Sequence, residues 1–277
     1  MHTRRRAPRS FLALIRLAIL FVVVAVPTVA KAQVPSMQAL MLGGFWSRVD
    51  SARVQQTAAG TQISIETGYI APQLMGLIDG AISGKSFTAT MQLATFPTVG
   101  SSTLLKADGA RVQSVDLPAA NALVKGRALL GVKFALAGAP ASGPTTTIPP
   151  SNPLGVYLQP DHFRIDFDSL VGTTVMSVQK MTVVMPAQRA NIPQLVLTYS
   201  TTSRSTEAQA FMSGLQQWLT SQTTRNGTLT FLTNDFKSNL LTIHYQGLRV
   251  LSNNISGTTA TATFAVAGIS VSNVLMR

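Results

Sequence analysis

Apolar and polar residues alternate along several segments in the second half of the chain. Alternation at every second position is typical of a strand with one buried and one solvated face. The clearest segment, 162–168, alternates four polar with three apolar residues: His162, Phe163, Arg164, Ile165, Asp166, Phe167 and Asp168. The pattern predicts further strands over 173–185, 195–199, 228–232, 240–245 and 259–267.

A helical periodicity interrupts these strands after residue 205. The run Thr206-Glu207-Ala208-Gln209 predicts a capping box, with a hydroxyl at the N-cap and an acid near the positive helix end. The apolar residues that follow fall on one helix face: Phe211, Leu215, Trp218 and Leu219. The Asn226-Gly227 pair predicts a stop or a turn soon afterwards. We therefore expect one helix that packs on a sheet.

The first half of the chain follows a similar outline. Its pattern predicts strands over 62–66, 87–93 and 132–138 and a helix over 74–82. The sequence VKFALAG at 132–138 resembles ATFAVAG at 262–268, and an Asp-Ser pair at 50–51 resembles one at 168–169. The offsets are 130 and 118 residues, so either a duplication with insertions or chance similarity accounts for them.

A Pro-rich segment separates the two halves. Residues 137–153 read AGAPASGPTTTIPPSNP and lack apolar periodicity, which is typical of a linker or an exposed long loop. We predict a first β-rich domain over 33–139, a linker over 140–155 and a second β-rich domain with a flanking helix over 156–277. The predicted fold class is mainly β with one or two short helices, in two tandem small β-barrel or sandwich domains. The alternative is a single sandwich whose sheets are joined by a long crossover.

The amino terminus has the features of a secretory signal. Four arginines precede an apolar stretch over 17–26, and Ala30-Lys31-Ala32 gives a small-x-small cleavage pattern. An uncleaved membrane anchor is the alternative, because the apolar stretch can be extended back to Phe11, but Arg16 interrupts the extended stretch and Pro27 follows it. We predict that 1–32 is a signal peptide, that mature protein begins at Gln33 without an integral membrane segment, and that it is secreted or periplasmic.

Cleavage would remove much of the positive charge. Residues 1–32 contain six of the 22 basic residues and none of the ten acids, so 33–277 carry a net charge of +6 rather than +12. The remaining Lys and Arg are scattered without a basic run, which disfavours nucleic acid as a partner. The chain has no cysteine, so a disulfide framework and a thiolate nucleophile are both excluded.

Catalytic and metal-binding signals are sparse. The sequence GAISGKS at 80–86 is one residue short of a phosphate-binding loop, and a Gly-Ser turn explains it better. His162 and His244 are the histidines that follow the signal segment, and either could in principle join a serine and Asp161 or Asp166 in a triad. The outward position of His244 between Thr242 and Gln246 favours an exposed strand histidine instead.

The polar row on 162–168 is the remaining candidate. Asp166 and Asp168 could contribute oxygen ligands to calcium, but Arg164 in the same row favours a salt-bridged, solvated face. We predict no catalytic, cofactor-binding or metal-binding residue and no cofactor.

Several segments together resemble a known family. They are 163–170 (FRIDFDSL), 172–185, 195–199 (LVLTY), the helix with Trp218, 225–232 (RNGTLTFL) and 262–269. The chain resembles the tail tube proteins of contractile-tailed phages and related injection machines over 157–273, and more faintly over 45–140. The resemblance implies a small β-barrel with a flanking helix, stacked hexameric rings and no catalytic residues. Two barrels in one chain would need three chains per six-barrel ring.

These observations predict an exported, non-enzymatic structural or self-associating β-rich protein. The segment 259–267 has no charged residue, so unless it is central in its sheet we expect it to pair with another chain. We therefore expect a homo-oligomer formed through sheet edges. The alternative is a secreted hydrolase or a cell-surface carbohydrate-binding protein whose site has no recognisable motif.

Overall fold

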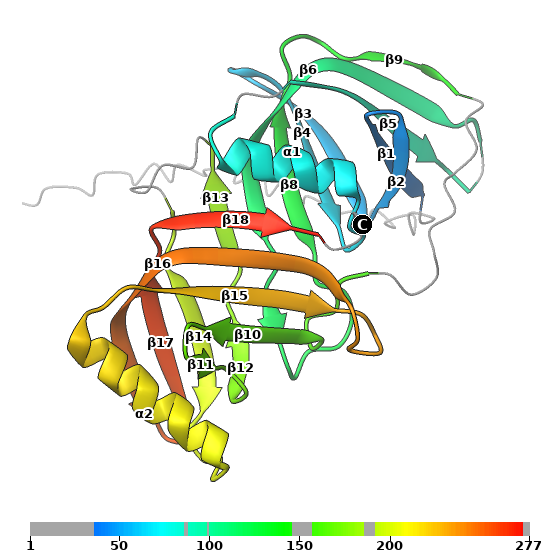
Figure 1. Cartoon of the computed structure of the whole chain (residues 1–277). Coiled ribbons are helices and arrows are strands. Elements are labelled where there is room, and N and C mark those ends of the chain that lie inside the picture. Colours follow the sequence, from blue (N-terminus) through cyan, green and yellow to red (C-terminus); the bar gives the residue numbers. More distant parts are fainter. Residues whose placement is uncertain (1–35, 86–87, 99, 146–156, 186–191, 274–277) are drawn as a thin grey trace, which may run out of the picture. The chain divides into compact units, whose positions relative to one another are not determined.

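The fold is built from two antiparallel sheets, which confirms the mainly β, sandwich-like prediction (Figure 1). The computed structural model describes residues 36–85, 88–98, 100–145, 157–185 and 192–273. The signal segment predicted over 1–32 therefore lies outside the described residues. Within the described ranges, no helix has the length and apolar character needed to cross a membrane.

The first sheet has nine strands within the described residues. Its path runs β2-β1-β5-β6-β8-β4-β3, and β9 and β13 each pair with β6. The strands are β1 (Met37–Leu42), β2 (Phe45–Val49), β3 (Ser51–Thr57), β4 (Gly60–Thr67), β5 (Ala89–Phe96), β6 (Thr103–Leu117), β8 (Leu130–Ala135), β9 (Ala141–Pro144) and β13 (Met181–Val184).

The second sheet also has nine strands in the described part of the chain. Its path runs β11-β10-β15-β16-β17-β14-β12-β7, and β18 pairs with β16. The strands are β7 (Ala120–Asn121), β10 (Phe163–Phe167), β11 (Leu170–Val171), β12 (Val175–Val178), β14 (Leu195–Ser200), β15 (Arg225–Leu232), β16 (Asn239–Ser256), β17 (Thr259–Ala265) and β18 (Gly268–Ser272).

The two sheets share one pairing order. The first path becomes the second, apart from its last strand β7, when β1, β2, β3 and β4 are replaced by β10, β11, β12 and β14, and β5, β6 and β8 by β15, β16 and β17. Helix α1 (Pro72–Ile82) precedes β5 as helix α2 (Thr206–Ser221) precedes β15. After β8 and β17, the next strand returns to β6 and β16 respectively.

The shared pairing order shows whether the similar sequences of the two halves lie at equivalent places in the two sheets. The sequences at 132–138 and 262–268 occupy matching places, in and just after β8 and β17. The two Asp-Ser pairs do not match, because residue 50 lies between β2 and β3 whereas residue 168 lies between β10 and β11. One similarity that sequence reasoning missed is GARVQS at 109–114 against GLRVLS at 247–252, at the bends of β6 and β16.

Strands from each half of the sequence enter the other sheet. Strand β13 pairs with β6, and β7 pairs with β12. The division into domains over 33–139 and 156–277 stays a prediction. Part of the predicted linker is β9, which pairs with the first part of β6. Backbone pairing does not need apolar side chains, so this Ala-Ser-Gly-Pro strand has no periodic signal.

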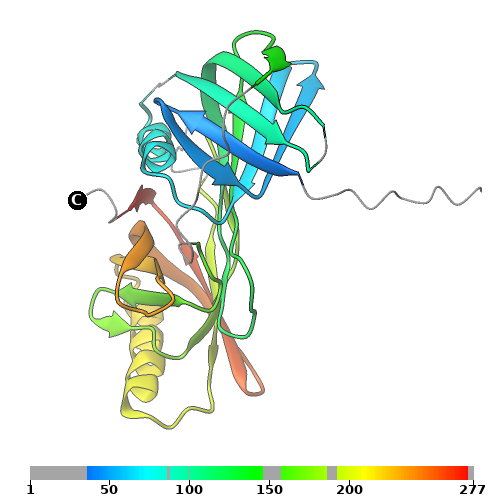
Figure 2. The same ribbon diagram turned by 90° about the vertical axis from the view of Figure 1, so that its right-hand side faces the viewer.

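Aromatic packing fixes helix α2 on one face of the second sheet (Figures 1 and 2). The Trp218 ring lies 5.6 Å from the Phe167 ring and 5.3 Å from the Phe264 ring, centre to centre. Trp218, Phe211 and Leu215 are fully buried, as the helical periodicity predicted. The predicted N-cap is wrong by one residue: the side chain of Ser205 accepts the hydrogen bond from the Ala208 amide.

Several predicted strand limits also differ from the structure. The run 173–185 forms two strands, β12 and β13, which join different sheets. The predicted strand 240–245 is the beginning of the longer β16. The Asn226-Gly227 pair lies within β15 and makes no turn. A Cβ at 227 would lie 2.7 Å from the Phe167 ring. Close packing therefore explains this glycine.

Candidate functional site

The polar row on β10 forms a solvated ion-pair face, as predicted. The Arg164 Nε donates to the Asp166 carboxylate over 2.7 Å. Asp168 accepts a hydrogen bond from the Asn226 amide at 2.8 Å. The imidazole of His162 instead packs edge-on against Phe236, 4.3 Å between ring centres. Among the described residues, no cluster of three or more histidine and carboxylate side chains could hold a metal ion.

His244 is paired with a serine but not with an acid. Its Nε2 lies 2.9 Å from the Ser272 hydroxyl on the neighbouring strand β18. Asp166 is in register with Thr228, which is in register with His244, so one strand separates the carboxylate from the imidazole. Asp166 also faces Arg164. His244 therefore lacks the carboxylate that would orient a catalytic imidazole.

The glycine-rich segment at 80–86 begins within a helix. Its first three residues are the last turn of α1, and Gly84 has a φ of +76° in the turn that follows. Asp79, just before the segment, accepts a hydrogen bond at 3.1 Å from the amide of Val271 on β18. The described part of this segment therefore ends a helix. Residues 86–87 lie outside the described residues.

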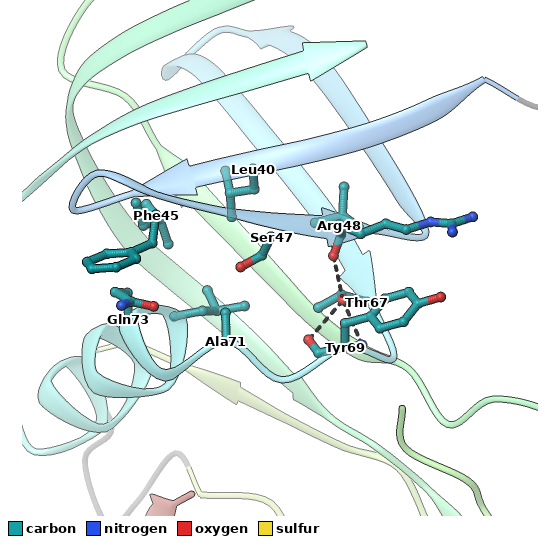
Figure 3. Close-up of a pocket in the computed structure, with 11 residues that line it drawn as sticks. Leu40, Phe45, Ser47, Arg48, Thr67, Tyr69, Ala71 and Gln73 are labelled. Carbon is teal, nitrogen blue, oxygen red and sulfur yellow. Dashed lines mark hydrogen bonds between the residues drawn. The ribbon is translucent and has the colours of Figure 1, made fainter. Parts of the chain in front are cut away.

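A small pocket opens beside β2 and the start of α1 (Figure 3). Its volume is about 10 Å³, roughly the space of one water molecule. The Thr67 hydroxyl accepts from the Tyr69 amide at 2.9 Å and lies 3.4 Å from the Arg48 carbonyl oxygen. Leu40 and Ala71 supply apolar walls. The pocket is too small for an organic substrate.

Two arginines and two tyrosines form a cluster beside this pocket. The Arg127 guanidinium lies 5.1 Å from each of the Tyr69 and Tyr157 ring centres, and the Arg48 guanidinium lies 5.7 Å from that of Tyr69. Arg127 is also ion-paired with Asp50. Cation–π contacts of this kind stabilise the packing of Tyr157 on the first sheet. The cluster thus has a structural role.

The open backbone edges of the two sheets are a further candidate. Strand β16 bends: its first part pairs with β15 and β18, and its second part, 249–256, pairs with β17. Within the described residues, no strand pairs with the other edge of this second part. Leu251 and Ile255 on it are exposed, Ile255 to 69%. Strand β3 also has an open edge, since it pairs only with β4 among the described strands, and β2, β7, β9, β11, β13 and β18 likewise each pair with one strand there.

The segment that the sequence predicted as a possible edge is not an edge in the structure. The predicted segment 259–267 contains β17, which is central because β14 and β16 pair with its two sides. The condition for its pairing with another chain is therefore not met. Sequence alone could not show this, because an uncharged strand is compatible with either an edge or a central place.

Comparison with known proteins adds no further constraint. No protein-family model and no curated protein matches this chain. The resemblance to tail tube proteins therefore stays a prediction, and so does the duplication of the two halves.

Proposed function

We propose that this chain is an exported, non-enzymatic structural protein that associates with copies of itself through open sheet edges. The observation that carries the proposal is the uncovered second part of β16, a strand edge whose only charged residue is Arg249. An open edge has unpaired backbone donors and acceptors that another strand can satisfy. Monomeric proteins usually protect such edges with charges or prolines.

The chemistry of the described residues also favours a structural role. His244 pairs with Ser272 and has no hydrogen bond to an acid among the described residues, and Asp166 in the polar row on β10 is ion-paired with Arg164. A hydrolase would need a general base oriented within hydrogen-bonding reach of its nucleophile. The proposal includes the predicted export signal at 1–32. It also includes the resemblance to tail tube proteins, which implies two repeated β units per chain and three chains per ring.

Light scattering of purified protein lacking residues 1–32 tests the function. We expect the mean mass to rise with concentration over the micromolar range, and a plateau near three chains would support a closed ring. A mass of one chain at all concentrations up to about 100 micromolar would overturn the proposal. Asn254→Lys should reduce association because it adds charge to the open edge, whereas Thr261→Lys, its neighbour on the central strand β17, is the matched control.

A further inference from the structure

Two connections of the second sheet carry exposed apolar side chains. The first connection, residues 122–126, follows β7 and contains Leu123 and Val124, and Leu123 is exposed to 75%. The second connection, residues 233–238, joins β15 to β16 and contains Phe236, exposed to 56%. Single exposed apolar side chains are common, whereas several gathered at one place indicate an interaction site. Whether the two connections lie together therefore decides what they mean.

A short segment before β10, residues 159–162, contacts the first connection. The Asn121 amide, at the start of that connection, donates to the Pro160 carbonyl at 2.6 Å. The Asp161 carboxylate forms an ion pair with Lys125. Both contacts hold residues 122–126 against this segment.

The same segment contacts the second connection. The Gln159 side-chain amide donates to the Asn234 side-chain carbonyl at 2.7 Å. The His162 ring packs edge-on against the Phe236 ring, 4.3 Å between centres. Because four consecutive residues contact both connections, the two are neighbours. Their exposed side chains form one tip surface: Leu123, Val124, Lys125, Phe236 and Lys237.

Hydrogen bonds within each connection fix its backbone. In the first, the Leu123 amide donates to the Asn121 side chain at 2.9 Å. In the second, the Lys237 amide donates to the Asp235 carboxylate at 3.2 Å, and the Ser238 amide donates to the Thr233 hydroxyl at 3.1 Å. The tip surface is therefore preorganised, and binding through it orders little further backbone.

Phe236 adopts a backbone conformation that disfavours large side chains. Its φ is +59°, in the left-handed region where glycine and asparagine are the usual residues. The ring is more than half exposed, so its burial within the chain offsets little of this strain. Strained residues of this kind are found at ligand contacts. Phe236 thus combines strain with exposure at the centre of the tip surface.

Positive charge accompanies the apolar side chains. A lysine follows directly in each connection, Lys125 in the first and Lys237 in the second. The Lys125 side chain is exposed to 84%, whereas that of its partner Asp161 is exposed to only 6%. Asp235 accepts hydrogen bonds from its own turn. Residues 33–277 as a whole carry a net charge of +6. Apolar side chains beside lysines are complementary to acyl chains below anionic phosphates.

We propose that the tip surface binds peripherally to lipid bilayers that contain anionic headgroups. Leu123 and Phe236 enter the boundary between headgroups and acyl chains, and the two lysines lie beside the phosphates. A protein partner fits less well, because a stable protein interface covers about 800 Å² on each partner and two narrow connections offer little flat surface. The inference does not depend on self-association, since the tip surface contains no residue of the second part of β16.

Flotation with lipid vesicles tests the proposal. Residues 34–277 form a compact unit of their own, and the apolar segment within 1–32 would itself bind lipid, so protein lacking 1–32 is the sample. We expect it to float with vesicles of equal parts phosphatidylcholine and phosphatidylglycerol, and far less with phosphatidylcholine alone. Lys237→Gln should weaken binding about fivefold, because it removes one charge near the membrane surface.

Phe236→Asn is the decisive variant. It should weaken vesicle binding about tenfold, because one large apolar side chain no longer leaves water. Asparagine tolerates the left-handed conformation, so the urea midpoint should not fall, and a loss of binding then does not reflect unfolding. Ile255→Asn is the matched control, since this exposed apolar residue lies at the far end of β16. It should bind vesicles like the unmodified protein.

Three results would overturn the proposal: no flotation of the unmodified protein, full binding by Phe236→Asn, or an equal loss in Ile255→Asn. Light scattering without lipid distinguishes a protein partner. If Phe236→Asn lowers the mass there and vesicles bind none of the unmodified protein, the tip surface contacts another copy of the chain and the lipid proposal is rejected. A monomeric protein that still floats rejects only the proposed self-association.

Discussion

Asp116 on β6 contacts the segment that contains β13 through its carboxylate. Lys180 forms an ion pair with its carboxylate at 2.8 Å, and Thr182 donates a hydrogen bond. Burial would raise the pKa of Asp116, but the hydrogen bonds from Lys180 and Thr182 and the charges of Lys180 and Lys133 together lower the pKa below its usual value.

This lowered pKa has a consequence for stability. Because the folded pKa is below the unfolded value of about 3.9, the ionised carboxylate stabilises the fold above about pH 4, and the stabilisation is lost as the pH falls through the folded pKa. We expect Asp116→Asn to lower the free energy of unfolding at pH 7 by about 1 kcal/mol. The difference from the unmodified protein should shrink at pH 3.

Urea unfolding at both pH values measures the effect. Asp108→Asn is the matched control, because Asp108 is on β6 outside the part that pairs with β13. An unchanged difference between pH 7 and pH 3 would contradict the stated role of the Asp116 carboxylate.

Trp218, on helix α2, is the largest fully buried side chain among the described residues. Its indole Nε1 donates to the Thr223 carbonyl at 2.8 Å, and its ring packs against Phe167 and Phe264. We expect Trp218→Ala to reduce the free energy of unfolding by about 3–5 kcal/mol, since the change leaves a cavity and removes a satisfied donor. Circular dichroism during urea unfolding measures this loss. Trp46→Ala, at a half-buried residue of β2, should cost clearly less. Equal losses would show that the helix does not depend on this ring.

At the scale of elements, β6 and β16 each bend, so that the two parts of each strand pair with different neighbouring strands. Each bend has a glycine in the left-handed region, Gly109 with φ +66° and Gly247 with φ +57°. A Cβ on either would lie 2.8 Å from the Cβ of an alanine, Ala137 or Ala267. Both conformation and space therefore require glycine.

We expect Gly247→Ala and Gly109→Ala to destabilise the protein by similar amounts, about 1–2 kcal/mol from the backbone conformation and more if the neighbouring alanine cannot shift. Chemical denaturation measures both. Gly138→Ala is the control, because a Cβ there meets nothing within 4 Å and its φ is not in the left-handed region. If the two bend variants differ widely, the two bends are not equivalent.

At the scale of the whole molecule, one apolar cluster includes buried residues from both halves of the sequence. Val183, for example, is fully buried in this cluster. Its strand β13 belongs to the first sheet, whereas the strands before and after it in the sequence, β12 and β14, belong to the second. Because the halves share strands and core, we expect them to unfold together. Calorimetry of the protein lacking residues 1–32, at a concentration below the onset of association, should give a single transition. Two resolved transitions would instead support the two separate domains predicted from the sequence.

The sequence by itself determined those features that depend on neighbours within a few residues. Alternation located β10 and β14, and the four-residue and three-residue spacing of Phe211, Leu215 and Trp218 located α2 and its buried face. These features follow from local periodicity, because the burial of one face repeats at every second residue in a strand and every three or four in a helix.

Only the tertiary structure decided which strands lie at the edges. Strand β17 has no charged residue and is central, whereas the second part of β16 has one, Arg249, and is open among the described strands, so their compositions hardly distinguish them. The place of β13 beside β6 likewise depends on a pairing between residues 66 positions apart, such as Asp116 and Thr182. Backbone groups of all residues are nearly alike, so the choice of pairing partner is set by how the whole chain packs.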